Sequence, residues 1–289
     1  MSIVNNAMVL NLAIGLWQGY RLDKDASRKV TDDANAEGDA ARVNKHLIPK
    51  AALKDVSSLA SAIRVHFYTN TLPWKDNGDR LLTRVLYTKF IEEHEELVGQ
   101  FNTAVRKFLD TGYPAAVEQA AFRMGDLFKS EDYPRVSDLE RRFYVQLDID
   151  AVTEAGDFRV AMEKTQLDSI QSTMEQAMQK RIAGAMQSVW ERLLKVVAHL
   201  HEKLADQDAV FRDSAVRNIE ELVELLPGLN VLDDPNLERM RKEVEYSLTG
   251  LDLKDLRKDP AVRSAAAKEA EEIMESMGSY MRAFQHAET

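Results

Sequence analysis

The sequence predicts a mainly α fold: an elongated helical bundle with one long helix and a small antiparallel β-sheet in the N-terminal half. Three observations predict it. A helical pattern without Pro runs from 158 to 205, β-favouring segments lie near 8–22 and 143–150, and Pro or Gly separates the other helical patterns. We therefore expect two domains: a helical unit with the small sheet at 1–159, and the long helix with a C-terminal helical bundle at 160–289.

The composition is that of a folded, acidic protein. The chain has 289 residues, of which 45% are hydrophobic and 30% charged, and its formal net charge is −10. Because a negative charge opposes a broad contact with phosphates, the balance does not favour nucleic acid as a partner. The absence of Cys excludes disulfides, thiolate catalysis and Cys-based metal sites, and it fits a reducing compartment.

The two strand segments differ in pattern. The first, 8–22, is apolar throughout, and its Gly15 and Gly19 argue against a helix and for a bent strand or hairpin. The second, 143–150, alternates apolar and polar residues, as a half-buried strand does. An isolated strand would leave its backbone groups unpaired, so we expect the two segments to pair across more than a hundred residues.

The other segments of the first half are predicted to be largely helical. Pro is favoured at the first position of a helix and Gly just after the last, which places the boundaries. The expected elements are a charged connector or poorly packed helix at 23–45, a helix from Pro49 to about Thr69, a helix from about Leu82 to Asp110 ended by Gly112, and two helices begun by Tyr113-Pro114 and Tyr133-Pro134.

The long helical pattern has apolar residues every 3.7 positions on average, which predicts a nearly straight or weakly right-handed packing helix, not a left-handed leucine zipper. A helix of about 45 residues is about 65–70 Å long, whereas a compact globule of this chain length is about 50 Å across. The helix must therefore project, or be covered by other helices or another subunit. Its apolar residues are Leu167, Ile170, Met174, Met178, Ile182, Met186, Val189, Leu193, Val197, Leu200 and Leu204.

Three further helices are expected near 207–226, 234–249 and 260–285. Short connections would allow them to fold back on the long helix as antiparallel partners. The dipeptides that separate them are Pro227-Gly228, Asp234-Pro235 and Asp259-Pro260.

No segment predicts a membrane span or a secretion signal. The longest apolar run near the start, 8–17, is interrupted by Asn11 and Gly15 and is shorter than the roughly 20 residues that cross a bilayer. It also lacks a basic leader. We expect a cytoplasmic protein without a membrane partner.

No motif predicts a cofactor, a metal site or catalysis, so we expect a non-enzymatic protein. GxxxxGK, GxGxxG and GxSxG do not occur, and no His completes HExxH or the Glu-x-x-His pair of di-iron bundles. Two clusters of potential metal ligands remain, and a solvated helix face is the simpler interpretation of each. They are Glu92, Glu93, His94, Glu95 and Glu96, and His199, His201, Glu202 and Asp206.

The stretch TLPWKDNGDRLLT, at 71–83, is predicted to be a corner between two helices. Pro73 ends the first helix, Asp76-Asn77-Gly78 supplies a turn, and Leu81-Leu82 begin the next hydrophobic face. In this interpretation Trp74 packs across the corner and has a structural role.

The same stretch also has the composition of a contact site. Arg80 could reach Asp76, Asp79 or a helix-end carbonyl within the corner. An exposed Trp beside Arg is, however, typical of an interface hot spot or of a platform on which a base stacks. The candidate partner-binding residues are Trp74, Asp76 and Arg80.

Five motifs, in order LNLAIGLWQGYRL, RVHFYTNTLPWKDNGDRLL, FNTAVRKFLDTGYP, GDLFKSEDYP and GDFRV, resemble those of a group of uncharacterised proteins from tailed phages, prophages and integrative elements. More distantly, they resemble a bacterial family of unknown function. The similarity covers about residues 8–162. In that group the genes often lie near a MoxR-like AAA+ ATPase and a von Willebrand A domain protein, or near recombination genes. The resemblance implies a mobile-element origin and partnership with such a machine, but no activity.

These features predict a non-enzymatic phage or mobile-element protein that self-associates or binds a protein partner through helical surfaces, as an adaptor of an AAA+ ATPase system. The alternative is a DNA-handling accessory protein for annealing, end-binding or recombination. A third hypothesis, a helical metalloenzyme, would require bound metal. The DNA-handling hypothesis requires a group of basic residues to gather on one surface. These residues are Arg64, Arg80, Arg84, Arg106 and Lys107.

Overall fold

The computed structural model describes residues 3–154, 156, 163–206 and 213–285. It confirms the predicted fold class, because the described chain is mainly helical, with one long helix and a small antiparallel sheet in the N-terminal half. The α-helices are α1 (Lys24–Asp33), α2 (Lys54–Asn70), α3 (Arg84–Lys107), α4 (Tyr113–Met124), α5 (Val136–Glu140), α6 (Lys164–Ala205), α7 (Ser214–Leu229), α8 (Pro235–Leu248), α9 (Leu253–Lys258) and α10 (Pro260–Gln285). The strands are β1 (Ala7–Gly15), β2 (Tyr20–Asp23), β3 (Val43–His46), β4 (Leu72–Pro73), β5 (Arg80–Thr83) and β6 (Tyr144–Ala151).

The chain forms two compact units, which differ from the two predicted domains. Unit 1 consists of 1–11, 70–90 and 148–289, and unit 2 consists of 12–69 and 91–147. The chain therefore passes between the units four times. Pairing between strands that are distant in sequence gathers three segments into unit 1, so a single boundary could not describe the division. The predicted boundary, between 159 and 160, lies outside the described residues.

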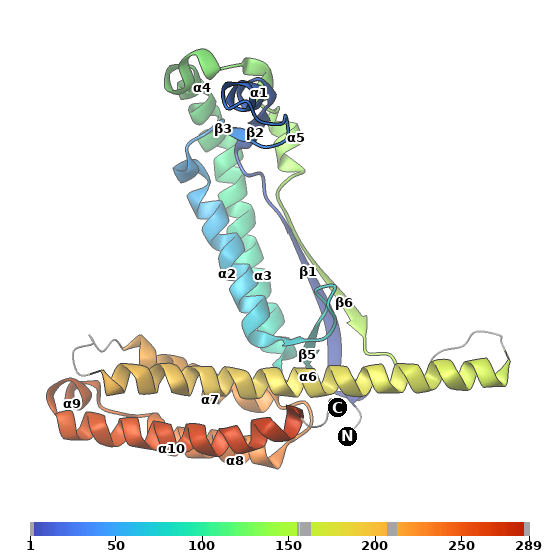
Figure 1. The fold of residues 1–289 in the computed structure, drawn as a ribbon, viewed down its shortest axis with the longest axis vertical. Helices are drawn as coiled ribbons and strands as arrows, with labels where there is room; N and C mark the ends of the chain where they lie inside the picture. The colour runs from blue at the N-terminus through green and yellow to red at the C-terminus, as the bar shows by residue number, and fades with distance from the viewer. Residues whose placement is uncertain (1–2, 155, 157–162, 207–212, 286–289) are drawn as a thin grey trace. The chain divides into compact units, whose positions relative to one another are not determined.

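The core of unit 1 is a helical bundle. Figure 1 shows α10 running antiparallel to α6, as the sequence predicts, and α6 also contacts α7. The indole of Trp190 on α6 stacks on the ring of Tyr280 on α10, with ring centroids 5.5 Å apart. Other side chains of this core that are at most 1% exposed are Val189, Leu193, Val197, Ile219, Leu226, Met240, Val244 and Met277.

The long helix α6 is continuous over 42 residues and passes through Gly184 without a break. This confirms the predicted long helix, although its predicted first residues, 158–162, lie outside the described residues. All of the buried side chains of α6 lie at Ala185 or beyond. Figure 1 shows why, since α7 and α10 lie beside the C-terminal half of α6 only.

The predicted start of the helix after the corner is wrong. Leu81 and Leu82 belong to β5, and α3 begins at Arg84. In the antiparallel register Leu81 lies opposite Val9 and Leu82 opposite Met8 of β1. Both leucines are fully buried. A short apolar run by itself fits either a helix or a strand, and here pairing with a distant strand makes it a strand.

The predicted break at Pro227-Gly228 is also wrong, because α7 continues to Leu229. The Thr83 hydroxyl donates a hydrogen bond of 2.6 Å to the Gly228 carbonyl, which fixes this end of α7 against β5. A Cβ atom on Gly228 would lie 2.6 Å from Cγ of Leu86. Gly228 therefore serves close packing between chain segments and does not end the helix.

The four-stranded sheet has the order β4-β5-β1-β6. The neighbouring positions of β1 and β6 confirm the predicted pairing of the two strand segments. The first segment, however, divides into two strands, and β2 pairs antiparallel with β3 in a separate two-stranded sheet. Most of β3 lies in the segment 23–45 that was predicted to be a charged connector or a poorly packed helix, because Val43–His46 is short and mostly polar.

The core of unit 2 joins α2, α3 and the short helices that follow. The hydroxyl of Tyr113 donates to the Pro134 carbonyl at 2.7 Å, and that of Tyr133 donates to the Leu47 carbonyl at 2.9 Å. Burial raises the pKa of Tyr113 to about 12, which keeps this donor protonated. The predicted helix start at Tyr113 is confirmed, whereas the helix after Tyr133 begins only at Val136.

A buried ion network holds the β2–β3 sheet to the chain after α4. The Lys45 side chain is 6% exposed, and its ammonium pairs with Asp132 and lies 3.7 Å from the Asp23 carboxylate. Arg21 reaches the other oxygen of Asp132 at 2.8 Å. The pKa of Asp23 lies below its usual value, mainly because its carboxylate accepts a hydrogen bond from the backbone N–H of Ala26, and secondarily because of the positive charge of Lys45. These charges are compensated because both signs are present within the network.

Removing one member of this network should be costly. Asp132→Ala leaves the buried Lys45 ammonium with the Leu127 carbonyl and with no carboxylate nearer than Asp23 at 3.7 Å, so we expect the free energy of unfolding to fall by about 3 kcal/mol in urea denaturation. Lys129→Ala is the control, because its pair with Asp25 is exposed and should change stability by less than about 0.5 kcal/mol. Equal losses in both variants would contradict a buried network.

Two glycines in helices should respond in opposite directions to the same substitution. Gly228→Ala must displace Leu86 and should lower the free energy of unfolding by about 1–3 kcal/mol. A Cβ on Gly184 meets no atom within 4 Å, so Gly184→Ala should raise it by about 0.5–1 kcal/mol through helix propensity. Thermal and urea unfolding of both variants would check this, and a stable Gly228→Ala protein would contradict the packing.

Candidate functional site

The predicted corner at 71–83 is a β-hairpin within unit 1. Its strands β4 and β5 pair antiparallel, with Leu72 opposite Leu81 and Pro73 opposite Arg80. Two hydrogen bonds close the turn. The backbone N–H groups of Trp74 and Lys75 donate them to the Asp79 carbonyl, at 3.1 and 3.2 Å. Gly78 has a φ of +95°, which only Gly adopts without strain, so the predicted turn at 76–78 is confirmed.

The Asp79 carboxylate stabilises the turn from inside. It accepts hydrogen bonds from the Lys75 ammonium and from the Asn11 amide, each at 3.0 Å. The backbone N–H of Asp79 donates to the side-chain oxygen of Asn77 at 3.1 Å. Lys75 first, and then Asn11, lower the pKa of Asp79 because they stabilise its charged form.

The three predicted partner-binding residues have different environments. Trp74 is 5% exposed and belongs to the apolar core of unit 1. It is therefore not the exposed Trp that the hot-spot interpretation requires. The Asp76 side chain is exposed. Arg80 is partly buried and donates through Nε to the Thr71 hydroxyl at 2.7 Å and through its terminal nitrogen to the Thr71 carbonyl at 2.8 Å. Of the three contacts suggested for Arg80, the structure shows the carbonyl at the end of a helix.

A second arginine joins the hairpin to the long helix. Arg192 of α6 donates to the same Thr71 carbonyl at 2.6 Å. Burial, and secondarily the charge of Arg80, lower the pKa of Arg192 to about 10, so its guanidinium stays charged at neutral pH. Two guanidinium groups therefore share one carbonyl, which ties β4 and α6 together in unit 1.

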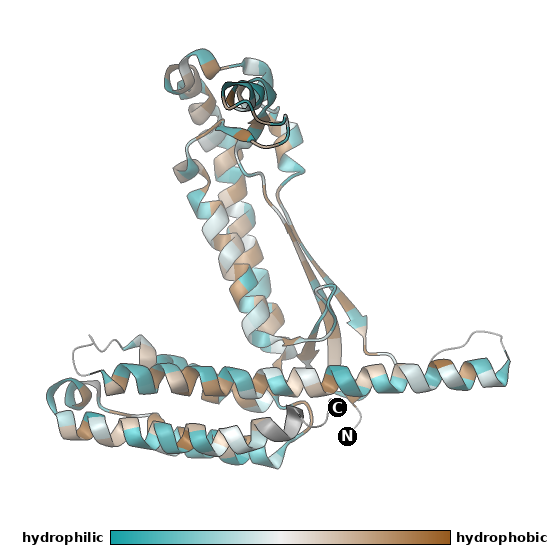
Figure 2. Ribbon diagram, in the orientation of Figure 1, coloured by the Kyte–Doolittle hydropathy of each residue, from teal (hydrophilic) through white to brown (hydrophobic). Residues whose placement is uncertain are grey.

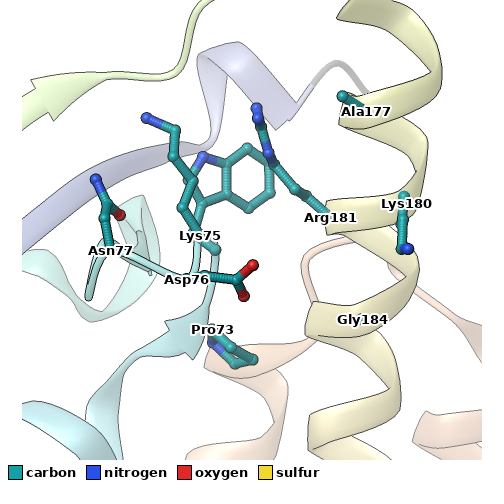
Figure 3. Close-up of a pocket in the computed structure, with 9 residues that line it drawn as sticks. Pro73, Lys75, Asp76, Asn77, Ala177, Lys180, Arg181 and Gly184 are labelled. Carbon is teal, nitrogen blue, oxygen red and sulfur yellow. The ribbon is translucent and has the colours of Figure 1, made fainter.

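Two neighbouring pockets lie between the hairpin and α6. The larger has a volume of about 620 Å³ and the smaller about 420 Å³, and both are lined by Trp74, Lys75 and Arg181. Figure 3 shows Arg181 extending from α6 toward the hairpin, while Lys180 lies along the helix. The larger pocket is bounded further by Asp76, Pro73, Asn77, Ala177, Lys180 and Gly184.

The charges of this region nearly balance. Lys75 is compensated by Asp79. Lys180 and Arg181 have no ion pair among the residues that the structure describes, and Asp76 and Asp150 line the same two pockets. A pocket with this lining suits a mixed polar and apolar protein surface better than an isolated anion.

The N-terminal half of α6, residues 164–184, presents an apolar stripe beside these pockets. Leu167, Ile170 and Met174 fall within a narrow arc of one helix face and are partly exposed. Within the described chain, the apolar core of unit 1 includes Met178 and Ile182 at its edge but not these three. Figure 2 shows polar and apolar residues interspersed along the whole of α6.

The candidate metal ligands do not converge. His94 is 5% exposed and its ring lies 6.2 Å from that of His66, whereas Glu95 and Glu96 are exposed on the other side of α3. Burial, and then the charge of His66, lower the pKa of His94. No three His, Asp or Glu side chains in the described part of the chain are grouped so that they could hold a metal ion.

The basic residues of the DNA-handling hypothesis are divided between the units. Arg64, Arg106 and Lys107 belong to unit 2, and Arg84 and Arg80 to unit 1. Arg80 is already engaged with Thr71. The hypothesis therefore loses one of its five candidates to a structural contact, and stays a prediction for the others.

Sequence reasoning missed the residues that complete the pockets. Arg181 and Gly184 lie about a hundred positions from the hairpin, and only the packing of α6 against β4 brings them near Trp74. One signal was available: Gly184 interrupts an otherwise strong helix pattern, and a Gly in a helix interior needs a local reason.

Every described helix is either too short or too polar to cross a membrane.

Protonation of Asp79 should loosen the hairpin. Its pKa is lower in the folded protein than the usual 3.8, so its contribution to stability is full above that value and disappears as pH falls through the folded pKa. Asp79→Asn should therefore cost about 1–2 kcal/mol of unfolding free energy at pH 7, and less as the pH is lowered below about 3.8. Urea denaturation across this pH range measures both values.

The matched control is Asp76→Asn, three residues away. Its carboxylate is exposed and makes no hydrogen bond to the residues that the structure describes. Its substitution should change stability by less than about 0.5 kcal/mol at either pH. A pH-independent loss in Asp79→Asn would contradict the assigned role of the charge.

Comparison of the chain with protein-family models, with curated proteins and with solved structures finds no match. Its function must be inferred from its own residues.

Proposed function

We propose that this is a non-enzymatic binding protein, which self-associates or binds a protein partner through helical surfaces of unit 1. The contact face is the N-terminal half of α6 together with the two pockets beside the β4–β5 hairpin. Trp74 and Asp76 belong to this face because they line the larger pocket. Arg80 does not line that pocket and instead donates a hydrogen bond to Thr71.

The observation that carries the proposal is the mismatch in length between α6 and its neighbours. At 42 residues α6 is about 63 Å long, while α10, its longest partner in the bundle, has 26 residues and is about 39 Å long. About 16 residues of α6 therefore extend past the bundle, and they carry Leu167, Ile170 and Met174 on one face. An amphipathic helix with an open apolar stripe is a common contact surface for another helix.

Two aromatic residues that are almost fully exposed do not compete with this face. Phe122 of α4 is 97% exposed and Tyr246 of α8 is 91% exposed. Neither is part of an apolar helix stripe beside a pocket, and single exposed apolar residues are ordinary on protein surfaces. The stripe on α6 is supported by three side chains and by two adjoining pockets.

The nature of the partner follows from the motifs of the first half. One motif of the resemblance, RVHFYTNTLPWKDNGDRLL, contains β4, the turn and the first three residues of β5, so a segment that carries the resemblance also lines the pockets. This coincidence supports a phage or mobile-element protein that acts as an adaptor, with an AAA+ ATPase as the partner. No nucleotide-binding or nucleophile motif in the sequence supports an activity of the chain itself.

Charges placed on the stripe should abolish binding without unfolding the protein. The variant combines Leu167→Asp, Ile170→Asp and Met174→Asp, which are outside the apolar core. We expect the self-association seen by light scattering at tens of micromolar, or the specific capture of partners from host cells, to fall by at least about tenfold, since burying an unpaired carboxylate is costly.

The control carries the same three charges on the opposite face of the same helix, as Ser169→Asp, Ser172→Asp and Gln176→Asp, where the side chains are exposed. It should bind as the wild type does. A wild-type protein that is strictly monomeric and captures nothing specific would refute the proposal, and equal losses in both triple variants would refute the assigned face.

A further inference from the structure

Gly184 lines the larger of the two pockets beside the β4–β5 hairpin, although the packing of the described residues does not require a glycine there. A Cβ atom at this position would meet no atom of the described chain within 4 Å outside its own helical turn. The helix α6 continues through Gly184, and Gly weakens a helix interior relative to Ala. A bare backbone at the wall of a pocket allows another molecule to approach the helix closely.

Trp74 offers a hydrogen-bond donor to the same space. Its side chain is almost fully buried and lines both pockets. The indole N–H donates to no residue in the described part of the chain. Unlike the indole nitrogen of Trp190, this nitrogen is not enclosed by protein atoms. Because the rest of the side chain is fixed in the core, the N–H is held in place for an acceptor oxygen in the pocket.

Arg181 and Lys180 bring positive charge to the larger pocket. Figure 3 shows Arg181 extending from α6 toward the hairpin, and its side chain is partly buried. Neither cation has an ion pair among the residues that the structure describes. Lys75 also lines this pocket, and of its described lining residues Asp76 alone is acidic. A partly buried guanidinium without a carboxylate is a favourable contact for an acidic side chain, which it binds through two parallel hydrogen bonds.

We propose that the larger pocket binds an extended acidic segment of the partner protein. A carboxylate of this segment pairs with Arg181 and Lys180, and an oxygen of its backbone accepts a hydrogen bond from the Trp74 indole. Its backbone passes close to α6 at Gly184. The inference rests on the proposed function, because it names the chemistry of the partner at the same contact face.

Two other occupants match the pocket less well. A nucleic-acid base stacks on an exposed aromatic face, which the buried ring of Trp74 does not offer. A basic segment would be repelled by the cations of α6 and would find only Asp76 to pair with. An acidic segment with apolar neighbours suits both the charge of the pocket and its apolar lining by Pro73 and Ala177.

Selection of binding peptides tests the occupant. A library of short random peptides displayed on phage is panned against the full-length protein. We expect the enriched sequences to carry Asp or Glu beside an apolar residue. Replacing that acidic residue with its amide should weaken binding of the synthetic peptide at least about tenfold in fluorescence anisotropy. Enrichment of basic sequences, of uncharged sequences or of none would overturn the proposal.

Two substitutions in the pocket should change the affinity for the selected peptide in opposite directions. Arg181→Gln removes the paired cation and should weaken binding at least about tenfold. Asp76→Asn removes a like charge and should strengthen binding about twofold to fivefold. The reverse signs, or no effect of either change, would overturn an acidic occupant. Displacement of the peptide by single-stranded DNA at physiological salt would identify phosphate as the ligand and would also overturn it.

Trp74→Phe tests the hydrogen bond of the indole. The variant keeps an aromatic ring in the core and loses the N–H, so it should bind the selected peptide about fivefold more weakly. Urea denaturation shows whether the variant is folded. A folded variant with wild-type affinity would contradict the role of Trp74 in binding.

Gly184→Ala separates binding from folding. The variant should be more stable than the wild type, yet bind the selected peptide about fivefold more weakly, because its methyl group occupies space that the peptide needs. The matched control is Gly278→Ala within α10, where a Cβ also meets no atom within 4 Å and which lines neither pocket. It should bind as the wild type does. Wild-type affinity in Gly184→Ala would contradict the close approach.

The failure of this inference is distinct from the failure of the proposed function. If the wild type self-associates or captures a partner and the stripe variant does not, while Arg181→Gln binds as the wild type does, the proposed function stands and the acidic segment is wrong. If acidic peptides bind in a manner that depends on Arg181 and Gly184, but the protein is monomeric and captures no partner, the pocket inference stands and the proposed function fails.

Discussion

The structure of unit 1 depends on one constraint, the joint that ties the β4–β5 hairpin to the long helix. The carbonyl of Thr71 accepts hydrogen bonds from both Arg80 and Arg192, so one oxygen fixes a strand and a helix that are more than a hundred residues apart in sequence. Burying a guanidinium is costly unless its donors are satisfied. The contact therefore gives this joint a specific geometry, and the pockets beside Trp74 exist because α6 is held there.

The same joint explains why a helix as long as α6 has two halves with different roles. Beyond Ala185 its apolar side chains are covered by α7 and α10, whereas before Gly184 it passes the hairpin and then extends past the bundle. The hydrophobic spacing is similar in both halves. The difference between core and contact surface comes from the lengths of the neighbouring helices, not from the composition of α6.

The sequence predicted what depends on local or periodic patterns and missed what depends on distant pairing. The spacing of apolar residues predicted α6, and the alternation at 143–150 predicted β6. Leu81 and Leu82 were assigned to a helix because two apolar residues fit either structure, whereas pairing with β1, about seventy residues earlier, and with β4 makes them a strand. The residues of the pockets come from hairpin and helix together, so only Trp74 and Asp76 could be named in advance.

The division into discontinuous units has a consequence for the order in which the protein is made. Unit 2 ends at 147 and contains all of its residues when roughly half of the chain has left the ribosome, whereas unit 1 needs both the first strand and the last helix. The early part of β1 and the hairpin must wait, without their helical bundle, until synthesis is complete. During that interval exposed strand edges are open to wrong partners. An N-terminal fragment that ends before α6 would remain in this vulnerable state.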